Sequence, residues 1–497
     1  KLILNVLLFK APMSSIKNNI KIIGWGSAVL LIILVIGFLL LPKEYDIPTM
    51  LRSAPIGTGY AAKMLCSGVF VSGREPDSIW NEDLALMKRN MIRGRIDYEK
   101  KSVDAYALGF LFKQTAVYRG DCGCTLDIES SADAFWKDCD TPLSDPTADI
   151  KNAPWPLGDI LPKTAPHSEI DIQQLESTLD WAFSEPVPEH PVRTRAVIVL
   201  YDGKIIAERY ANGYSSETRF LGWSMTKSVT SALIGILVRE GKLDIHQPAT
   251  FPEWKTPGDP RGNITIDQLL RMSSGLSFQE DYEENPDSDA GFMFFTMKDM
   301  AAFAVQKPQE AKPDEKFNYS SGTTMLLSRI IRETVEGSGS HQKYLAFPRQ
   351  ELFQKLGMRS AIIECDPSGT MVGAGFMYAT ARDWARFGLL YCNDGVSNHE
   401  RILPEGWVKY SRTPTPPWPG YGAQFWLNSN EKDRWLPNCP SDLYSAWGHE
   451  GQFITIVPSR KTVIIRLGQT ADEEKNWNHD YFVSGILKAM PVKTALE

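Results

Sequence analysis

The chain has 497 residues, of which 43% are hydrophobic, and a formal net charge of −7 at pH 7. This composition is typical of a well-packed globular enzyme, and without a basic patch it argues against a protein that binds nucleic acid. The seven histidines are scattered with no His-x-x-x-His pair, and the chain has no Gly-rich phosphate loop and no Gly-x-Ser-x-Gly elbow. These absences argue against metal chemistry, nucleotide chemistry and an α/β-hydrolase site.

The first clear signal along the chain is an uncharged run of twenty residues from Ile22 to Leu41. It is long enough to span a bilayer and has no small-residue cleavage pattern at its end, so we predict an uncleaved transmembrane anchor over 22–42. Lysines precede the run and acidic residues follow it. By the positive-inside rule, residues 1–21 are a cytoplasmic tail, and the rest of the chain lies on the periplasmic or outer side of the inner (cytoplasmic) membrane. Residues 1–12, which begin with Lys, are interpreted as translated upstream sequence.

Residues 43–166 form an N-terminal extension and linker that contains Cys66, Cys122, Cys124 and Cys139. An oxidising compartment permits disulfides, and Cys139 can pair with Cys122 or with Cys124. The chain has seven cysteines, so at least one thiol stays free or pairs between chains. We interpret this region as a lid, a brace or an oligomer arm without chemistry of its own.

A β-hairpin is predicted over 195–210, where two β-branched runs flank an Asp-Gly turn. After a polar loop, Ser224 begins an apolar helix that stops at Gly241. Ser224 and Lys227 are three residues apart, so their side chains lie on one face of that helix. A helix start also offers unpaired backbone amides and the positive end of the helix dipole, which favour an alkoxide and a developing oxyanion.

Lys227 can act as a base only if its surroundings remove its proton. A lysine has an unperturbed pKa of about 10.4, and burial can lower that pKa by roughly 3 to 5 units. Trp223 and Met225 precede Lys227 and an apolar helix follows it, which favours burial. The alternative is that Ser224 is a helix N-cap and Lys227 a surface residue of the first turn.

Two later segments carry further candidate residues. Tyr319 lies in the loop 317–322, ahead of a helix predicted to begin near Thr323, and is a second acid/base candidate. The segment 447–452 leads into a strand at 453–457, and its glycines allow a substrate carbonyl to approach the backbone.

Three motifs occur in a defined order: Ser-x-x-Lys at 224–227, Tyr-Ser-Ser at 319–321 and His-Glu-Gly at 449–451. In this order the chain resembles the penicillin-recognising serine hydrolases, which include the class C β-lactamases. It is most similar to the branch of the 6-aminohexanoate-dimer hydrolases and related serine esterases. The segments 264–276, with Thr265 and Gln268 placed for a capping box, and 375–383 also resemble that group.

The likeness covers roughly residues 192 to 490 and implies a β-lactamase/transpeptidase-like α/β fold, in which an antiparallel sheet is flanked by helices. We therefore expect a serine hydrolase domain over 167–497. The hairpin at 195–210 and the strands near the C-terminus are expected to meet in one sheet, with a mostly helical insertion at about 243–400. The site is expected in the cleft between the sheet domain and the insertion.

The resemblance implies a role for each motif residue. Ser224 is the nucleophile, Lys227 its general base, and Tyr319 the group that passes the proton to the leaving group. The backbone amides of Ser224 and Gln452 form the oxyanion hole. Acylation gives an acyl-enzyme on Ser224 that water hydrolyses, and this chemistry needs no metal and no organic cofactor.

Two departures from the β-lactamases affect the expected substrate. His449 stands where those enzymes have a lysine that helps to hold the substrate carboxylate, and a histidine is mostly uncharged at neutral pH. Ser321 stands where they commonly have asparagine, which removes an amide that hydrogen-bonds an acylamino side chain. Both changes favour esters and linear amides over β-lactams. The implied substrate-binding residues are Ser321, Trp426, His449 and Gly451. Aromatic residues that either line the cleft or, as is more common for aromatic side chains, belong to the core are Trp418, Tyr421, Phe425 and Trp426.

An acidic run between Glu280 and Asp289 follows the Ser-Gly-Leu turn at 274–276. It is either a solvated loop or a surface that attracts a cationic substrate, and we favour the solvated loop.

The sequence thus predicts a membrane-anchored serine hydrolase that acts on a small ester or linear amide and has the capacity to form a homo-oligomer. The alternatives are a β-lactamase or penicillin-binding DD-peptidase, and a non-catalytic sensor that is acylated slowly or not at all.

Overall fold

The computed structural model describes residues 47–491 apart from 86, 88–90, 108–109, 130–135, 137–138, 140–150, 162–168, 282–284, 286, 338, 431 and 433. The chain divides into two compact units, residues 1–53 and residues 54–497. The anchor predicted over 22–42 lies outside the described residues and stays a prediction. Within the described ranges, no helix combines the length and the apolar character needed to cross a membrane.

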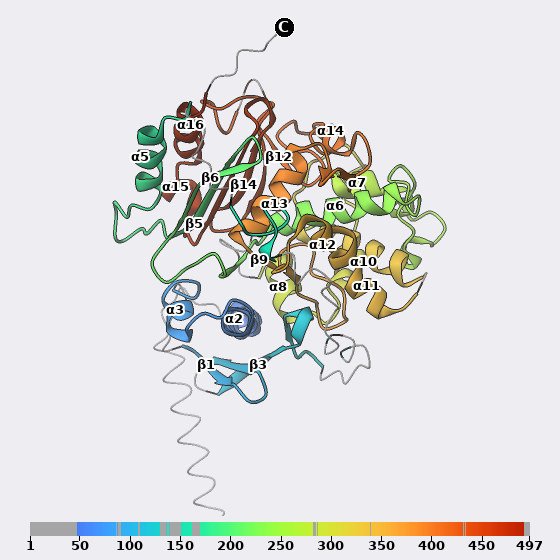
Figure 1. Cartoon of the computed structure of the whole chain (residues 1–497). Coiled ribbons are helices and arrows are strands. Elements are labelled where there is room, and N and C mark those ends of the chain that lie inside the picture. The colour runs from blue at the N-terminus through green and yellow to red at the C-terminus, as the bar shows by residue number, and fades with distance from the viewer. Residues whose placement is uncertain are drawn as a thin grey trace, which may run out of the picture. The chain divides into compact units, whose positions relative to one another are not determined.

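The second unit is built around a six-stranded antiparallel sheet with the strand order β12-β13-β14-β15-β5-β6 (Figure 1). Val199 of β5 lies opposite Ile464 of β15, so a strand from the start of the domain pairs with one from its end. The prediction that these segments meet in one antiparallel sheet is confirmed. The strands are β5 (Thr194–Tyr201), β6 (Lys204–Tyr210), β12 (Trp426–Leu427), β13 (Tyr444–Gly448), β14 (Gln452–Val457) and β15 (Thr462–Gly468).

Helices cover both faces of this sheet (Figure 1). On one face lie α5 (Ile172–Ala182) and α16 (His479–Ala489), and on the other lie α13 (Ala381–Cys392) and α6 (Met225–Arg239). Successive residues of β5 point to opposite faces, so Val199 joins the core of α5 and α16 while Ile198 joins the core of α6 and α13. Because both faces are covered, the strand is a continuous apolar run rather than an alternating one.

Between α6 and β12, helices make up most of the regular secondary structure that the structure describes. The capping box predicted at the first of these α-helices is confirmed, with Thr265 and Gln268 each bonding the backbone of the other. The helices are α7 (Ile266–Leu270), α8 (Asp289–Thr296), α9 (Met300–Val305), α10 (Ser321–Glu336), α11 (His341–Pro348), α12 (Gln354–Leu356) and α14 (Trp407–Ser411), and α15 (Glu473–Asn476) follows the last strand. The short strands are β7 (Arg219–Leu221), β8 (Ile362–Ile363), β9 (Met377–Thr380), β10 (Val396–Ser397) and β11 (Glu400–Arg401).

The extension begins with helices and continues into a small antiparallel sheet of order β1-β2-β3-β4. One disulfide joins Cys122 to Cys139, which is one of the two predicted pairings, and a second joins Cys66 to Cys124. The Cys66–Cys124 crosslink holds the end of α2 to the last strand, and the Cys122–Cys139 crosslink holds the turn before that strand to Cys139. The elements are α2 (Ile47–Cys66), a π-helical turn (Ser67–Val71), α3 (Pro76–Asn81), β1 (Ile92–Asp97), β2 (Ser102–Ala107), β3 (Leu111–Tyr118) and β4 (Cys124–Leu126).

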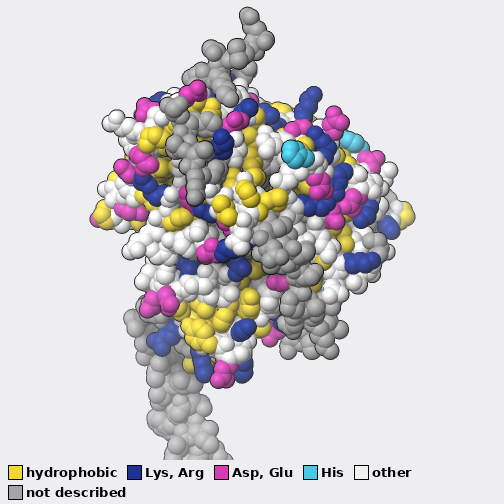
Figure 2. All heavy atoms as spheres, in the orientation of Figure 1, with side chains coloured by type: hydrophobic (Ala, Val, Ile, Leu, Met, Phe, Trp, Pro, Cys, Tyr) yellow, Lys and Arg dark blue, Asp and Glu magenta, His cyan; other side chains and the backbone are white. Residues whose placement is uncertain are grey.

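Hydrophobic side chains gather on the surface of this small sheet (Figure 2). Tyr98 in the β1–β2 turn is 62% exposed, and Phe110 in the β2–β3 turn is 78% exposed. The small sheet is thus less completely covered than the six-stranded sheet.

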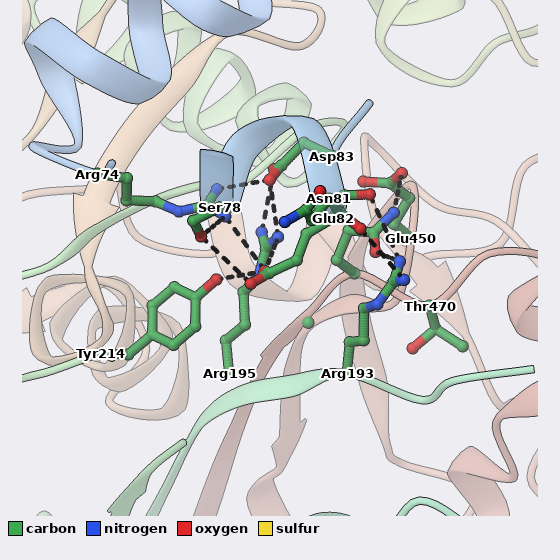
Figure 3. Close-up of polar contacts among 12 residues, drawn as sticks. Arg74, Ser78, Asn81, Glu82, Asp83, Arg193, Arg195, Tyr214, Glu450 and Thr470 are labelled. Atoms are coloured by element: carbon green, nitrogen blue, oxygen red, sulfur yellow. Dashed lines mark hydrogen bonds and ion pairs between the residues drawn. The ribbon is translucent and has the colours of Figure 1, made fainter. Parts of the chain in front are cut away.

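Ionic contacts join the extension to the part of the chain that is built around the six-stranded sheet. Glu364 is fully buried and accepts hydrogen bonds from Lys63, from the Ser67 hydroxyl at 2.8 Å and from the Cys124 amide at 2.7 Å. On β5, the Arg195 guanidinium donates to the Glu82 carboxylate at 2.7 Å, as Figure 3 shows. These contacts are those of a brace, one of the three roles considered for this region.

Candidate active site

The side chains of Ser224 and Lys227 meet at the start of α6. The Lys227 Nζ atom lies 3.0 Å from the Ser224 Oγ atom, and Lys227 is only 1% exposed while Ser224 is half-buried. Ser224 occupies the N-cap position, but its hydroxyl makes no capping hydrogen bond. The alternative of an N-cap serine with a surface lysine is therefore wrong, because Lys227 is buried and the Ser224 hydroxyl contacts the Lys227 amine.

A sharp turn presents Ser224 to its surroundings. Trp223 has a φ of +46°, which is rare for a bulky residue and marks a strained backbone. A Cβ atom at Gly222 would lie 2.4 Å from the Trp384 ring, so only glycine fits at that position. The strained turn and the close packing together fix the direction of the Ser224 side chain.

Lys227 is enclosed by polar groups from three other segments of the chain. Besides Ser224, its Nζ donates to the Ser321 hydroxyl at 3.0 Å and to the Ala374 carbonyl at 2.7 Å. Burial lowers the pKa of the Lys227 amine to about 8, although the Glu280 carboxylate opposes this shift. A fraction of the amine is thus neutral near pH 7, and a neutral amine at this distance can accept the Ser224 proton.

Tyr319 is the third predicted residue at this point. The Lys227 Nζ lies 5.0 Å from the centre of its ring, and the Ser224 hydroxyl is near enough to the phenol to act on its pKa. Burial raises the pKa of the Tyr319 phenol, so it keeps its proton at neutral pH and can donate it. The loop that carries Tyr319 is held by Asn318, whose amide donates to the Leu276 carbonyl at 3.1 Å. The Ser-Gly-Leu turn therefore supports the Tyr319 loop.

Glu280 is a residue of this site that sequence reasoning misjudged. Its half-buried carboxylate accepts hydrogen bonds from the Ser321 amide at 2.7 Å and from the Ser321 hydroxyl. The preferred interpretation of the acidic run as a solvated loop is wrong for this member, because Glu280 follows the Ser-Gly-Leu turn directly and turns inward with it. Its closeness to that turn was the available signal.

The third motif lies in the turn between β13 and β14. A Cβ atom at Gly448 would lie 3.1 Å from the Ser224 backbone nitrogen, so the end of β13 packs directly on the nucleophile turn. His449 stacks edge-on against Trp223 at 5.4 Å. Gln452 begins β14, and its side-chain amide donates to the His449 carbonyl at 3.1 Å. The oxyanion role of the Gln452 backbone amide stays a prediction.

Gly451 has a φ of +79°, and a Cβ atom there would lie 2.0 Å from a nitrogen of Arg466. Glycine is required at this position both by the left-handed backbone and by the lack of space. The backbone geometry thus explains why residue 451 is glycine, and the role of Gly451 in substrate binding stays a prediction.

Comparison with known proteins agrees with this geometry. Residues 179–483 match the family model described as Beta-lactamase, which is more than half of the chain. The chain belongs to the β-lactamase family. The resemblance inferred from the three motifs is thus confirmed, and the fold is the antiparallel sheet with flanking helices that it implied.

Individual relatives of this β-lactamase-family chain are distant. A 6-aminohexanoate-dimer hydrolase from Paenarthrobacter ureafaciens is 28% identical over 327 residues, which cover 61% of this chain and 79% of that protein. A solved Bacillus anthracis protein, also described as a 6-aminohexanoate-dimer hydrolase, has a TM-score of 0.52 at 22% identity and covers 67% of this chain and 89% of its own. A solved Bacteroides dorei protein, described as a β-lactamase, has a TM-score of 0.51 at 17% identity, covering 65% of this chain and 99% of its own.

A row of half-buried aromatic rings runs beside the β-lactamase-family site. Trp426 lies 5.3 Å from the Tyr319 ring and 5.1 Å from the Trp447 ring, and Trp418 lies 4.8 Å from the Phe317 ring. Trp426 was predicted to bind substrate, and the structure brings it to Tyr319. We call Phe317, Trp418, Trp426 and Trp447 the aromatic row. Of the other rings predicted to line the cleft, Tyr421 is 1% exposed and Phe425 is 0% exposed. Phe425 instead packs in the core against Tyr391 at 4.6 Å.

The extension reaches the third motif through a chain of hydrogen bonds (Figure 3). Arg193 donates to the Glu82 carbonyl at 3.4 Å and to the Gln469 side chain at 2.5 Å. Gln469 in turn donates to the Glu450 carboxylate at 3.0 Å, and the Trp223 indole donates to the same carboxylate at 3.4 Å. The extension is therefore linked by hydrogen bonds to the turn between β13 and β14.

Proposed function

We propose that this β-lactamase-family serine hydrolase cleaves a small ester or a linear amide through an acyl-enzyme on Ser224. The observation that carries the proposal is the contact of 3.0 Å between the Ser224 hydroxyl and the buried Lys227 amine, whose pKa burial lowers to about 8. Lys227 takes the proton as Ser224 Oγ attacks the carbonyl carbon. Tyr319 then donates a proton to the leaving group, and water hydrolyses the acyl-enzyme.

The charge that develops on the substrate oxygen needs backbone donors. We propose the Ser224 amide as one of them, at the start of α6 where the helix dipole is positive. The second is expected from the β13–β14 hairpin, where Gln452 is the predicted donor. Gly448 supports this placement, because the end of β13 lies against the Ser224 backbone.

Residues of the second and third motifs and the aromatic row support esters and linear amides over β-lactams as substrates. The His449 imidazole lies 4.0 Å from the Glu450 carboxylate, so a substrate carboxylate placed there meets an anion. The Ser321 hydroxyl is already engaged by Lys227 and Glu280, which leaves it poorly suited to hold an acylamino group. The aromatic row offers apolar surface instead, which suits an uncharged acyl or leaving group.

The two disulfides of the extension support the proposed location outside the cytoplasm. We propose that residues 22–42 anchor the chain in the inner membrane and that the hydrolase lies on its outer side. A protease added to spheroplasts is expected to degrade the hydrolase part, and protection in intact spheroplasts would reverse this orientation.

The activity is tested on the full chain in detergent, with a chromogenic short-chain ester and a chromogenic cephalosporin. We expect ester hydrolysis that disappears in Ser224→Ala, and negligible cephalosporin hydrolysis. Serine-dependent turnover of the cephalosporin would make the β-lactamase the better assignment. Failure of Ser224 to become acylated by either compound, measured by intact-protein mass, would contradict both enzyme assignments.

A further inference from the structure

Four side chains form a continuous chain of hydrogen bonds that leads from the nucleophile into the protein interior. The Ser224 hydroxyl meets Lys227 at 3.0 Å, Lys227 meets the Ser321 hydroxyl at 3.0 Å, and that hydroxyl donates to Glu280. This chain of hydrogen bonds ends in the half-buried carboxylate of Glu280.

The hydrogen bonds at Glu280 favour its ionised form. One oxygen accepts from the Ser321 amide and the other from the Ser321 hydroxyl. A carboxylic acid would have to place its own hydrogen against one of these donors. Burial is the largest influence and raises the pKa of Glu280, and Lys227 and the two hydrogen bonds from Ser321 oppose this rise.

Acylation creates a charge that this interior must accommodate. When Ser224 Oγ forms its bond to the carbonyl carbon, its proton moves to Nζ and Lys227 becomes an ammonium ion. An ammonium ion buried without an anion is strongly destabilised. The groups in direct contact with Nζ are the Ser224 and Ser321 hydroxyls and the Ala374 carbonyl, and the Tyr319 ring lies over it. All of these groups are uncharged at neutral pH.

The charged groups nearby come from two loops. The loop after the Ser-Gly-Leu turn brings Glu280, which acts electrostatically on Lys227. The β13–β14 turn brings His449 and Glu450, which face Trp223 on the other side of the nucleophile turn. The carboxylate that reaches Lys227 through a shared hydroxyl is that of Glu280.

Building on the proposed function, we infer that Glu280 is a positioning residue that fixes Ser321 beside Lys227 and supplies the anion for the ammonium formed during acylation. Glu280 itself neither gains nor loses a proton. The proton that Lys227 receives from Ser224 leaves again by way of Tyr319 to the departing group. Ser321, which the sequence suggested as a substrate-binding residue, is in this arrangement the link between base and anion.

The test follows the rate at which a fluorophosphonate probe labels Ser224, as a function of pH. Labelling forms an Oγ–P bond and releases fluoride, so it reports the ionisation of Lys227 without any substrate being known. In the wild type, we expect the rate to rise with pH through a midpoint near the Lys227 pKa of about 8. Glu280→Gln keeps the shape but removes the charge, so the midpoint is expected to fall by about one pH unit and the plateau rate by about ten-fold.

Two variants separate charge from shape. Glu280→Asp restores the anion and is expected to return the midpoint to the wild-type value. Glu253→Gln is the matched control: the Glu253 carboxylate accepts from Arg329 of α10, and the carboxylate that acts on Lys227 is that of Glu280, so no shift is expected. Ser321→Ala keeps the hydrogen bond from the Ser321 backbone amide to Glu280 but removes the bridging hydroxyl. The plateau of the labelling rate should therefore fall while its pH midpoint stays unchanged.

A midpoint in Glu280→Gln within about 0.2 pH units of the wild type, in a protein that melts normally, would overturn the inference. If Glu280→Gln does not fold, a wild-type plateau in Ser321→Ala would overturn it equally. The proposed function fails separately, when the wild type labels at Ser224 but hydrolyses neither esters nor linear amides.

Discussion

Gly448 lies so close to Gly222 that a Cβ atom added to Gly448 would fall 2.2 Å from the Gly222 carbonyl oxygen. The end of β13 and the turn before Ser224 are therefore in backbone contact. This contact joins the third motif to the first, and it positions any oxyanion donor of the hairpin relative to the nucleophile.

Substitution of Gly448 should consequently affect catalysis more than stability. We expect Gly448→Ala to lower stability by about 1 to 3 kcal/mol through overpacking, and to lower kcat by about 100-fold because the two backbones are pushed apart. Gly203→Ala is the control, since Gly203 has a φ of +78° and nothing within 4 Å of an added Cβ. It should cost similar stability through backbone strain but leave kcat unchanged. Equal losses of kcat in both variants would refute the special role of the contact.

Lys227 is expected to favour activity at the expense of stability. Its pKa falls from about 10.4 in the unfolded chain to about 8 in the fold, so the unfolded state binds more protons between these values. Stability should therefore rise as pH increases from 8 to about 10.4, and below pH 8 the buried lysine costs about 3 kcal/mol. Lys227→Met should abolish turnover, raise the melting temperature at pH 7 and flatten the dependence on pH. A melting temperature lower than that of the wild type at pH 7 would contradict this account.

The brace depends on the buried pair of Lys63 and Glu364. Lys63→Ala leaves the Glu364 carboxylate buried without its cation, which should cost about 3 to 5 kcal/mol in denaturant unfolding. Lys316→Ala removes an exposed lysine that pairs with Glu310 at 2.6 Å, and it should leave unfolding unchanged. Indistinguishable unfolding curves for the two variants would show that the buried pair does not hold the extension.

The aromatic row is expected to select the acyl group. Trp418→Ala should lower kcat/KM about 10- to 50-fold for a long-chain ester and leave an acetyl ester nearly unaffected, since only the longer chain extends over the ring. Phe425→Leu is the control, because Phe425 is 0% exposed and should affect melting but not selectivity. A uniform loss of activity for both esters in Trp418→Ala would argue against this subsite.

The parts of the site that the sequence revealed are those fixed by local geometry. Ser224 and Lys227 are three residues apart on one helix, and Tyr319 sits in a loop that ends at a helix start. Helical spacing and turn chemistry are properties of short segments, so they can be read without knowing the fold. The hairpin and the capping box were predicted for the same reason.

Glu280 and the disulfide of Cys66 were missed because tertiary contacts determine them. Glu280 stands in an acidic run whose composition indicates a solvated loop, and only its bonds to Ser321 turn it inward. Cys66 ends a helix 58 residues before Cys124, and no local pattern tells that these two meet. Phe425 was misplaced for a related reason: it directly precedes Trp426, and neighbouring side chains of an extended segment point to opposite sides.

The partners of Glu364 and Arg195 have a consequence for where this molecule can be divided. Both residues belong to the part that matches the β-lactamase family, yet their counterions, Lys63 and Glu82, belong to the extension. A chain that begins at residue 167 would keep the three motifs, but the buried charges of Glu364 and Arg195 would lose these counterions. We therefore expect the folding unit of this protein to be larger than the matched residues 179–483 and to include the extension.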